Sequence, residues 1–478
     1  MKKIFVNILL ATSCLVSSCT KDFIELNTSK DGAKFTTPET LLGPAIHDVI
    51  KRNLNRCLRL THELMQVHVA ISDADEIHRY VIRPQESDYM WNNWYLQLTN
   101  IRDIYAGAEA VNSDAYKAIS LVLDAWVSSL ITDVYGDVPY FDANKGRQLV
   151  LQPKFDRQKD IYEDLFRKLE EANELFKTAS LTDDEKSLDP LYKGDLTKWR
   201  KFGNSLYLRL LLRVSGTGEL GAVEKIKEIV DTRKSNYPIF ANNNDSAILR
   251  FETTAPYLSE FHEYRNIDFV TNSGYTTFFI DNLNNWNDPR LDRWASKKDG
   301  VFEGIPSGYP VGQVPSPRSQ YLEALKQEPL LGNIMNYGEL KLILAECALK
   351  GYIDGDVETF YKDGVSAGIT LWGGTVPANY FVTTSAAWDP YTNDDRKLER
   401  IILQKYYALF FTDFQSWIEH RRTGFPTLPK GQGLHNDGVM PTRLKYPVNV
   451  QTLNRENYQK AVEQMGGDDM KTKVWWNK

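Results

Sequence analysis

The chain has 478 residues, of which 42% are hydrophobic and 25% are charged, a composition typical of a globular protein with a sizeable core. Its formal net charge is −6, and it contains no nucleic-acid-binding motif, so DNA and RNA are not expected as partners. Its seven histidines are scattered, and neither CxxC nor HExxH occurs, so no metal site is expected.

Residues 1–18 have the pattern of an export signal. Two lysines are followed by a short apolar run, which is too short to cross a bilayer as a helix, and then by small residues. The segment Val16-Ser17-Ser18-Cys19 resembles the bacterial lipobox, in which the cysteine is acylated and becomes the N-terminus. We therefore expect removal of residues 1–18, lipid on Cys19 and a tether over 19–38. The alternative is an ordinary cleaved signal with an incidental cysteine.

Helical periodicity dominates after the tether. Apolar side chains recur at three- and four-residue steps, which predicts helices over 39–71, 88–111 and 115–134. Asp156 is the expected N-cap of a helix over 157–178, and Thr197 is expected to start a helix over 198–214. We interpret these last two as an antiparallel hairpin.

A second hairpin is predicted over 336–350 and 356–371, with glycines between its helices, and a further helix over 395–411. No long alternating strand pattern occurs. The predicted fold class is therefore mainly α.

Three stretches lack helical periodicity, namely 240–332, 372–394 and 424–478. The first is rich in Asn, Gly, Pro and Tyr, and the second holds several aromatic residues. Long aromatic-rich loops in a compact protein are usually functional rather than disordered. We therefore expect a large loop-rich insert over about 240–332 that contributes to ligand binding.

Two cysteines remain after the signal and the lipid site. Cys57 and Cys347 each lie in an apolar helical pattern. They could form a disulfide, but two buried free thiols are the favoured interpretation.

Nine short segments occur in order over nearly the whole chain: residues 22–27, 135–140, 194–199, 204–209, 288–291, 345–348, 404–406, 421–426 and 443–447. Each is weak alone, and Arg421-Arg422-Thr423-Gly424-Phe425-Pro426 is among the strongest. Together they resemble the SusD/RagB-like family of outer-membrane nutrient-binding lipoproteins.

This resemblance implies a single α-helical domain over 39–478, with tetratricopeptide-like helical hairpins and an irregular ligand-binding region. It also implies anchoring in the outer membrane through lipid, at the cell surface. The expected partner is a TonB-dependent, SusC-like outer-membrane transporter. The expected ligand is a glycan, an oligosaccharide that the protein captures and delivers to the transporter. A peptide ligand is the alternative within the same family.

Glycan binding requires flat rings for the apolar sugar faces and amide groups for the hydroxyls. Two segments offer both, one at the expected start of the second helix and one in the loop-rich insert. The candidate ligand-binding residues are Trp91, Asn92, Asn93, Asn284, Trp286 and, more weakly, Tyr264, Tyr275 and Tyr309. The alternative for each tryptophan is a ring packed in the core.

An enzyme and a helical scaffold are the competing classes. A glycosidase needs two suitably spaced carboxylates, and Asp281, Asp288 and Asp292 lie in the insert, but a chain of this size supplies such sets by chance. No nucleophile elbow, phosphate loop or dinucleotide fingerprint occurs. A scaffold would not need aromatic-rich loops. We therefore expect no enzyme activity, no catalytic residue and no cofactor; bound calcium remains possible, without support from an EF-hand motif.

Arginine pairs attract anions, but they also tie structural joints together. For Arg421 and Arg422 we favour the structural role, in which guanidinium groups bind loop carbonyls and carboxylates.

Overall fold

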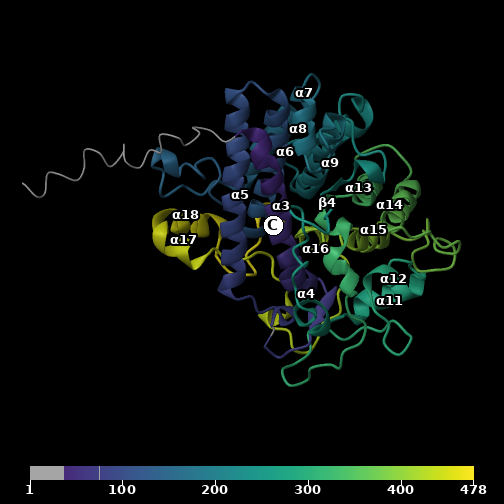
Figure 1. Ribbon diagram of the computed structural model, residues 1–478. Coiled ribbons are helices and arrows are strands. Elements are labelled where there is room, and N and C mark those ends of the chain that lie inside the picture. Colours follow the sequence, from purple (N-terminus) through teal and green to yellow (C-terminus); the bar gives the residue numbers. More distant parts are fainter. Residues whose placement is uncertain (1–36, 75) are drawn as a thin grey trace, which may run out of the picture. The chain divides into compact units, whose positions relative to one another are not determined.

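Helices dominate the computed structural model, which describes residues 37–74 and 76–478 (Figure 1). The α-helices in this part of the chain are α3 (Pro38–Arg56), α4 (His62–Leu64), α5 (Pro84–Ala110), α6 (Asp114–Tyr135), α7 (Gln158–Leu175), α8 (Asp183–Leu188), α9 (Leu196–Val214), α10 (Ala222–Lys227), α11 (Thr277–Trp286), α12 (Leu291–Trp294), α13 (Tyr337–Leu349), α14 (Val357–Leu371), α15 (Asp394–Ala408), α16 (Gln415–Thr423), α17 (Val448–Leu453) and α18 (Arg455–Met465). The mainly α fold predicted from periodicity is confirmed.

Residues Pro38–Lys478 form one compact unit. The signal segment 1–18, the lipidation site Cys19 and the tether up to residue 36 lie outside the described residues.

The core is built around α6, which packs between α5 and α7, while α3 packs on α5 (Figure 1). By length and composition alone α6 is apolar enough to cross a membrane, but its whole apolar window is buried inside the protein. It is therefore a central core helix. Ser113 caps it by accepting a hydrogen bond from the backbone N–H of Tyr116, and Gly136 ends it with a positive φ of 87°.

Two predicted helix starts need correction. Asp156 does not cap α7, which begins at Gln158; its carboxylate instead accepts hydrogen bonds from the backbone N–H groups of Tyr140 and Phe141. Asp195, rather than Thr197, caps α9 by accepting from the N–H of Lys198 at 3.1 Å. Only α9 is capped by a residue of the expected class, because Arg157 precedes α7 and its side chain makes no capping hydrogen bond. Each helix starts one or two residues away from the predicted position.

The hairpin of α13 and α14 is confirmed, and α15 packs against α13. An ion pair ties α13 to α9, because Arg209 donates to both carboxylate oxygens of Glu339 at 2.7 and 2.6 Å. Each side chain of this pair is 1% exposed. A bidentate pair at this depth fixes the two helices in one register.

The regions predicted to be loops contain more helix than expected. α11 and α12 lie within the insert, and α17 and α18 lie in the C-terminal region. The periodicity of α11 is hidden because the helix is only ten residues long and rich in asparagine, a poor helix former. The side chain of Thr276 starts α11 by accepting from the N–H of Phe279.

Two small antiparallel sheets join distant segments. Strand β1 (His68–Ala70) pairs with β3 (Ser273–Tyr275), with His68 opposite Tyr275 and Ala70 opposite Ser273. Strand β2 (Ala247–Ile248) pairs with β4 (Asn333–Met335). Both β2 and β3 come from the insert, so the two sheets attach the insert to segments on either side of it.

The thiols and the arginine pair agree with their favoured interpretations. Cys57 and Cys347 are free and buried. Arg421 donates to the carbonyls of Asp133 and Thr442, and Arg422 binds the carboxylates of Glu346 and Glu419. Both guanidinium groups therefore join structural elements.

Candidate functional site

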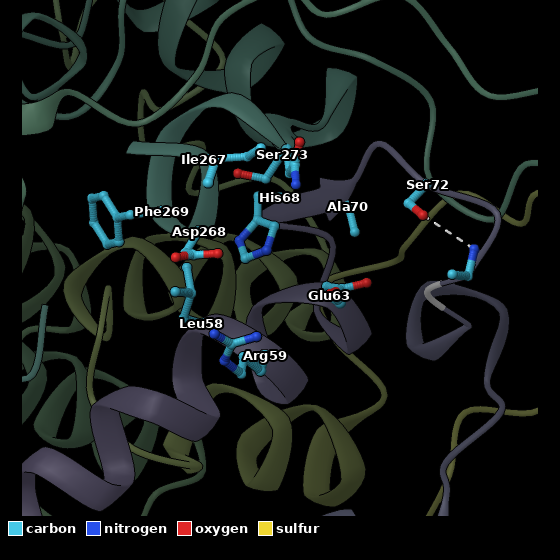
Figure 2. A pocket seen from close by; sticks show the side chains of 12 residues that line it. Leu58, Arg59, Glu63, His68, Ala70, Ser72, Ile267, Asp268, Phe269 and Ser273 are labelled. Atoms are coloured by element: carbon cyan, nitrogen blue, oxygen red, sulfur yellow. Dashed lines mark hydrogen bonds between the residues drawn. The ribbon is translucent and has the colours of Figure 1, made fainter. Parts of the chain in front are cut away.

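A cavity of about 270 Å³ lies where the segment that follows α3, β1 and the insert meet (Figure 2). Its wall combines charged, hydroxyl and amide side chains with small apolar surfaces. The lining residues are Leu58, Arg59, Glu63, His68, Ala70, Ser72, Ala74, Ile267, Asp268, Phe269, Asn272 and Ser273. We call this cavity the β1–β3 pocket.

Two π turns shape opposite walls of the β1–β3 pocket. Cys57–Thr61 interrupts the passage from α3 to α4, and Ile267–Thr271 precedes β3. A π turn inserts one extra residue into a helical segment and often occurs at functional sites, because it displaces side chains from the regular helical spacing. Here the first turn presents Arg59 to the pocket, and the second presents Asp268.

The wall from the insert is held by side-chain hydrogen bonds. The Gln320 amide nitrogen lies within 3.1 Å of three carbonyl oxygens, those of Val270, Thr271 and Ser273. At the rim, the Tyr309 hydroxyl donates to the carbonyl of Ala70 at 2.7 Å. Gln320 and Tyr309, which do not line the pocket, therefore hold its wall in place.

Two buried histidines share one tyrosine behind the pocket. The Tyr321 hydroxyl oxygen lies 2.5 Å from His68 Nδ1 and 2.8 Å from His62 Nδ1. Burial lowers the pKa of His68 to about 3, with a further contribution from the Arg59 charge. Burial, together with His68, holds the pKa of His62 well below its usual value. Both imidazoles are therefore neutral at physiological pH.

The charged groups of the β1–β3 pocket differ in burial. Arg59 is exposed and lies over the Tyr264 ring, with 5.8 Å between its guanidinium carbon and the ring centroid. Asp268 is exposed and accepts hydrogen bonds from Arg265. Glu63 is 2% exposed. The Arg59 guanidinium is thus the cationic group that lines the pocket.

The predicted residues of the second helix lie elsewhere. α5 begins at Pro84, so Trp91, Asn92 and Asn93 lie two turns inside it and not at its start. Trp91 is 7% exposed and lines a separate cavity of about 280 Å³ beside α17. Asn92 is exposed, whereas Asn93 donates to the carbonyl of Tyr89. Ligand contact by Trp91 and Asn92 stays a prediction.

The predicted residues of the insert are mostly packed inside. Trp286 is 1% exposed, donates to the Ser385 hydroxyl at 2.8 Å and packs on Tyr407, so its ring face is not available to a ligand. Asn284 donates to the carbonyl of Phe302. Tyr275 is fully buried and donates to the carbonyl of Trp294.

The two remaining tyrosines lie near the β1–β3 pocket. Tyr309 is 4% exposed and braces the pocket rim. Tyr264 is half-buried, accepts from Asn55 at 2.7 Å and lies under Arg59. Among the predicted residues, Tyr264 and Tyr309 are thus close to the pocket, while Trp91 and Trp286 are on different helices and are not brought together.

Trp286→Phe tests the structural role of this residue. The substitution removes the hydrogen bond to Ser385 and part of the ring from the core, so we expect a loss of about 1–3 kcal/mol in the free energy of unfolding. Ligand affinity should stay unchanged. Urea unfolding measures the stability, and calorimetric titration of the same preparation measures the ligand affinity. A loss of affinity at unchanged stability would contradict a structural role for Trp286.

Periodicity and ring chemistry missed the polar lining of the pocket. Arg59 and His68 both lie within the helix predicted over 39–71, so both resembled ordinary structural positions. The structure instead ends α4 at Leu64 and places His68 in β1. The usable signal is the close spacing of His62, Glu63 and His68 at the end of a helix, where polar residues interrupt an apolar run. Asn272 and Ser273 carry no signal, because only the pairing of β1 with β3 places them there.

Within residues 37–74 and 76–478, no group of three or more His, Cys, Asp or Glu side chains is arranged to hold a metal ion.

Several solved structures share this fold. The chain is similar to a chitin-binding protein at 25% identity and a TM-score of 0.78, over 92% of this chain and 100% of that one. A SusD homolog from Bacteroides uniformis matches at 22% identity and a TM-score of 0.80, over 92% and 99%. A chitin-binding SusD homolog from Flavobacterium johnsoniae matches at 19% identity and a TM-score of 0.80, over 92% and 98%. The comparison with curated proteins gave no match.

A family model agrees with these structural similarities and with the segments quoted from the sequence. The model described as starch-binding associating with outer membrane matches residues 30–447, which is most of the chain. The match includes the helical hairpins, the insert and the whole β1–β3 pocket. The chain therefore belongs to the SusD-like family of outer-membrane nutrient-binding proteins.

Proposed function

We propose that this protein is a lipid-anchored receptor at the cell surface that captures an oligosaccharide and delivers it to a TonB-dependent outer-membrane transporter. Membership of a starch-binding, outer-membrane family supports glycan as the ligand class. The lipobox-like segment ending at Cys19 supports the anchor. The transporter and the delivery step follow from what family resemblance implies.

The observation that carries the choice of site is the mixed lining of the β1–β3 pocket. Sugars offer hydroxyls, which need both donors and acceptors, and C–H faces, which need apolar contact. Ser72, Asn272 and His68 supply polar groups, while Ile267, which is 48% exposed, supplies apolar surface. This combination suits an uncharged polyhydroxylated ligand. We propose binding without catalysis.

Arg59→Ala is the direct test of this site. Loss of a charged hydrogen-bond donor costs about 1.5–3 kcal/mol, so we expect affinity for the bound oligosaccharide to fall by about 10- to 100-fold. Isothermal titration with starch- and chitin-derived oligosaccharides, in parallel with a peptide mixture, measures the affinity. Arg147→Ala is the matched control, because Arg147 is an exposed arginine outside the lining.

Binding of an oligosaccharide that is weakened by Arg59→Ala but not by Arg147→Ala supports the proposal. Equal affinity of both variants would place the site elsewhere, with the cavity beside Trp91 as the next candidate. Saturable binding of peptides and of no glycan would favour the peptide-binding alternative. Delivery is tested separately, by co-purification of a TonB-dependent barrel with the native lipoprotein from outer membranes.

A further inference from the structure

A chain of four hydrogen-bonding groups ends at the β1–β3 pocket. The backbone N–H of Phe411 donates to His62 Nε2 at 3.4 Å. His62 Nδ1 and His68 Nδ1 both contact the Tyr321 hydroxyl, at 2.8 and 2.5 Å. Among residues 37–74 and 76–478, no group hydrogen-bonds to His68 Nε2, and His68 lines the pocket, where Figure 2 shows its ring among the lining side chains.

The direction of this chain follows from counting protons. A neutral imidazole carries one N–H and one acceptor nitrogen. Because His62 Nε2 accepts from Phe411, its proton is on Nδ1, and that N–H donates to the oxygen of Tyr321. Tyr321 has a single proton, which it must then donate to His68 Nδ1. The remaining proton of His68 is therefore on Nε2.

We propose that His62 and Tyr321 form a proton-ordering relay that fixes His68 as an Nε2–H donor in the pocket, where it donates to an oxygen atom of the ligand. The ligand atom is a hydroxyl, ring or amide carbonyl oxygen, as oligosaccharides provide. His62 and Tyr321 are positioning residues, because neither lines the pocket and both act through His68. The second half of this inference rests on the proposed function, whereas the relay itself does not.

The surroundings of the relay keep it neutral over a wide pH range. His62 packs against His68, Phe410 and Phe411, and His68 packs against Tyr321. The charged groups that line the pocket beside His68 are Arg59, Glu63 and Asp268, and the Cys57 thiol and Tyr275 face Tyr321. Burial opposes an added proton on either imidazole. The donor is therefore expected to persist between pH 5 and 8.

The first test needs no ligand. In protein labelled with ¹⁵N-histidine, the imidazole nitrogen shifts of His68 report which nitrogen carries the proton. We expect the Nε2–H form alone, unchanged between pH 8 and pH 5. An Nδ1–H form, or an equal mixture of the two, would overturn the relay. If no oligosaccharide binds at all, the proposed function fails and this measurement still decides the relay.

The second test removes the Tyr321 hydroxyl, which connects the two histidines. Tyr321→Phe deletes the hydroxyl, so His68 should populate both tautomers and oligosaccharide affinity should fall by about threefold to tenfold. Tyr275→Phe is the matched control, because Tyr275 is equally buried, lies 4.7 Å from Tyr321 between ring centroids and bonds only to the Trp294 carbonyl. An affinity loss confined to Tyr321→Phe supports the relay. Equal losses of affinity in the two variants would show that Tyr321 acts only through packing, and this result would overturn the relay.

Discussion

Lowering the pH from 7 to 5 is expected to lower the free energy of unfolding by several kcal/mol, largely through three buried histidines. The pKa of His68 lies at about 3 and that of His420 at about 4, both lowered chiefly by burial, and the pKa of His62 is well below its usual value. In the unfolded chain each titrates near 6.5.

The sign follows from proton binding. Below pH 6.5 the histidines bind protons in the unfolded chain but not in the folded protein. The free energy of unfolding therefore decreases as the pH falls. At pH 5 each histidine contributes a loss of about 2 kcal/mol, because one pKa unit is worth about 1.4 kcal/mol. Asp413 and Asp137 act in the opposite direction, since burial raises the pKa of each carboxyl. They offset part of this loss.

Urea unfolding midpoints at pH 7 and pH 5 measure this loss. His420→Asn removes one titrating group, so its stability should change by about 2 kcal/mol less between the two pH values than that of the wild type. His435→Asn replaces an exposed histidine and serves as the control. Identical midpoints for the wild type at pH 7 and pH 5 would show that the buried imidazoles do not govern acid stability.

Glu339→Gln should lower the free energy of unfolding by about 3–5 kcal/mol, because it leaves the buried Arg209 without its carboxylate. The charge of Arg209 cannot reach water, since the side chain is 1% exposed. An apolar double variant, Arg209→Met with Glu339→Leu, should recover much of this loss, since it removes both charges from the core.

The matched control is a pair of the same kind at the surface. Arg167 and Glu171 form an i,i+4 ion pair on α7, with the arginine 60% exposed. Glu171→Gln should therefore change stability by less than about 0.5 kcal/mol. Urea or thermal unfolding of the wild type and these three variants measures the difference. A loss at Glu339→Gln as small as that at Glu171→Gln would show that water enters the α9–α13 interface.

Sequence pattern predicts the long helices well, because each has an apolar stripe that must be buried. In α7, Ile161, Leu165 and Leu169 form such a stripe, and glycines mark the break between α13 and α14. Short helices are not detected by apolar periodicity. α11 carries asparagines at several positions and spans only ten residues, so it resembles a loop until its packing against the core is known.

The candidate binding site is less predictable, because ring chemistry does not reveal burial. Trp286 has the right chemistry for a sugar, yet it is packed under Tyr407. The β1–β3 pocket depends on the pairing of His68 with Tyr275, two residues that lie far apart in the sequence. Local periodicity carries no information on such a pairing, and so Asn272 and Ser273 could not be placed beside Arg59.

The π turn Cys57–Thr61 gives this scaffold a simple route to new specificity. Loss of one residue from that turn would restore a regular helix and rotate the following residues by about 100° around the helix axis. Arg59 and Glu63 would then point to different neighbours, while α3 kept its place against α5. A one-residue deletion in this turn would therefore change the polar groups that line the β1–β3 pocket, together with the core packing of the buried residues Leu60, His62 and Leu64.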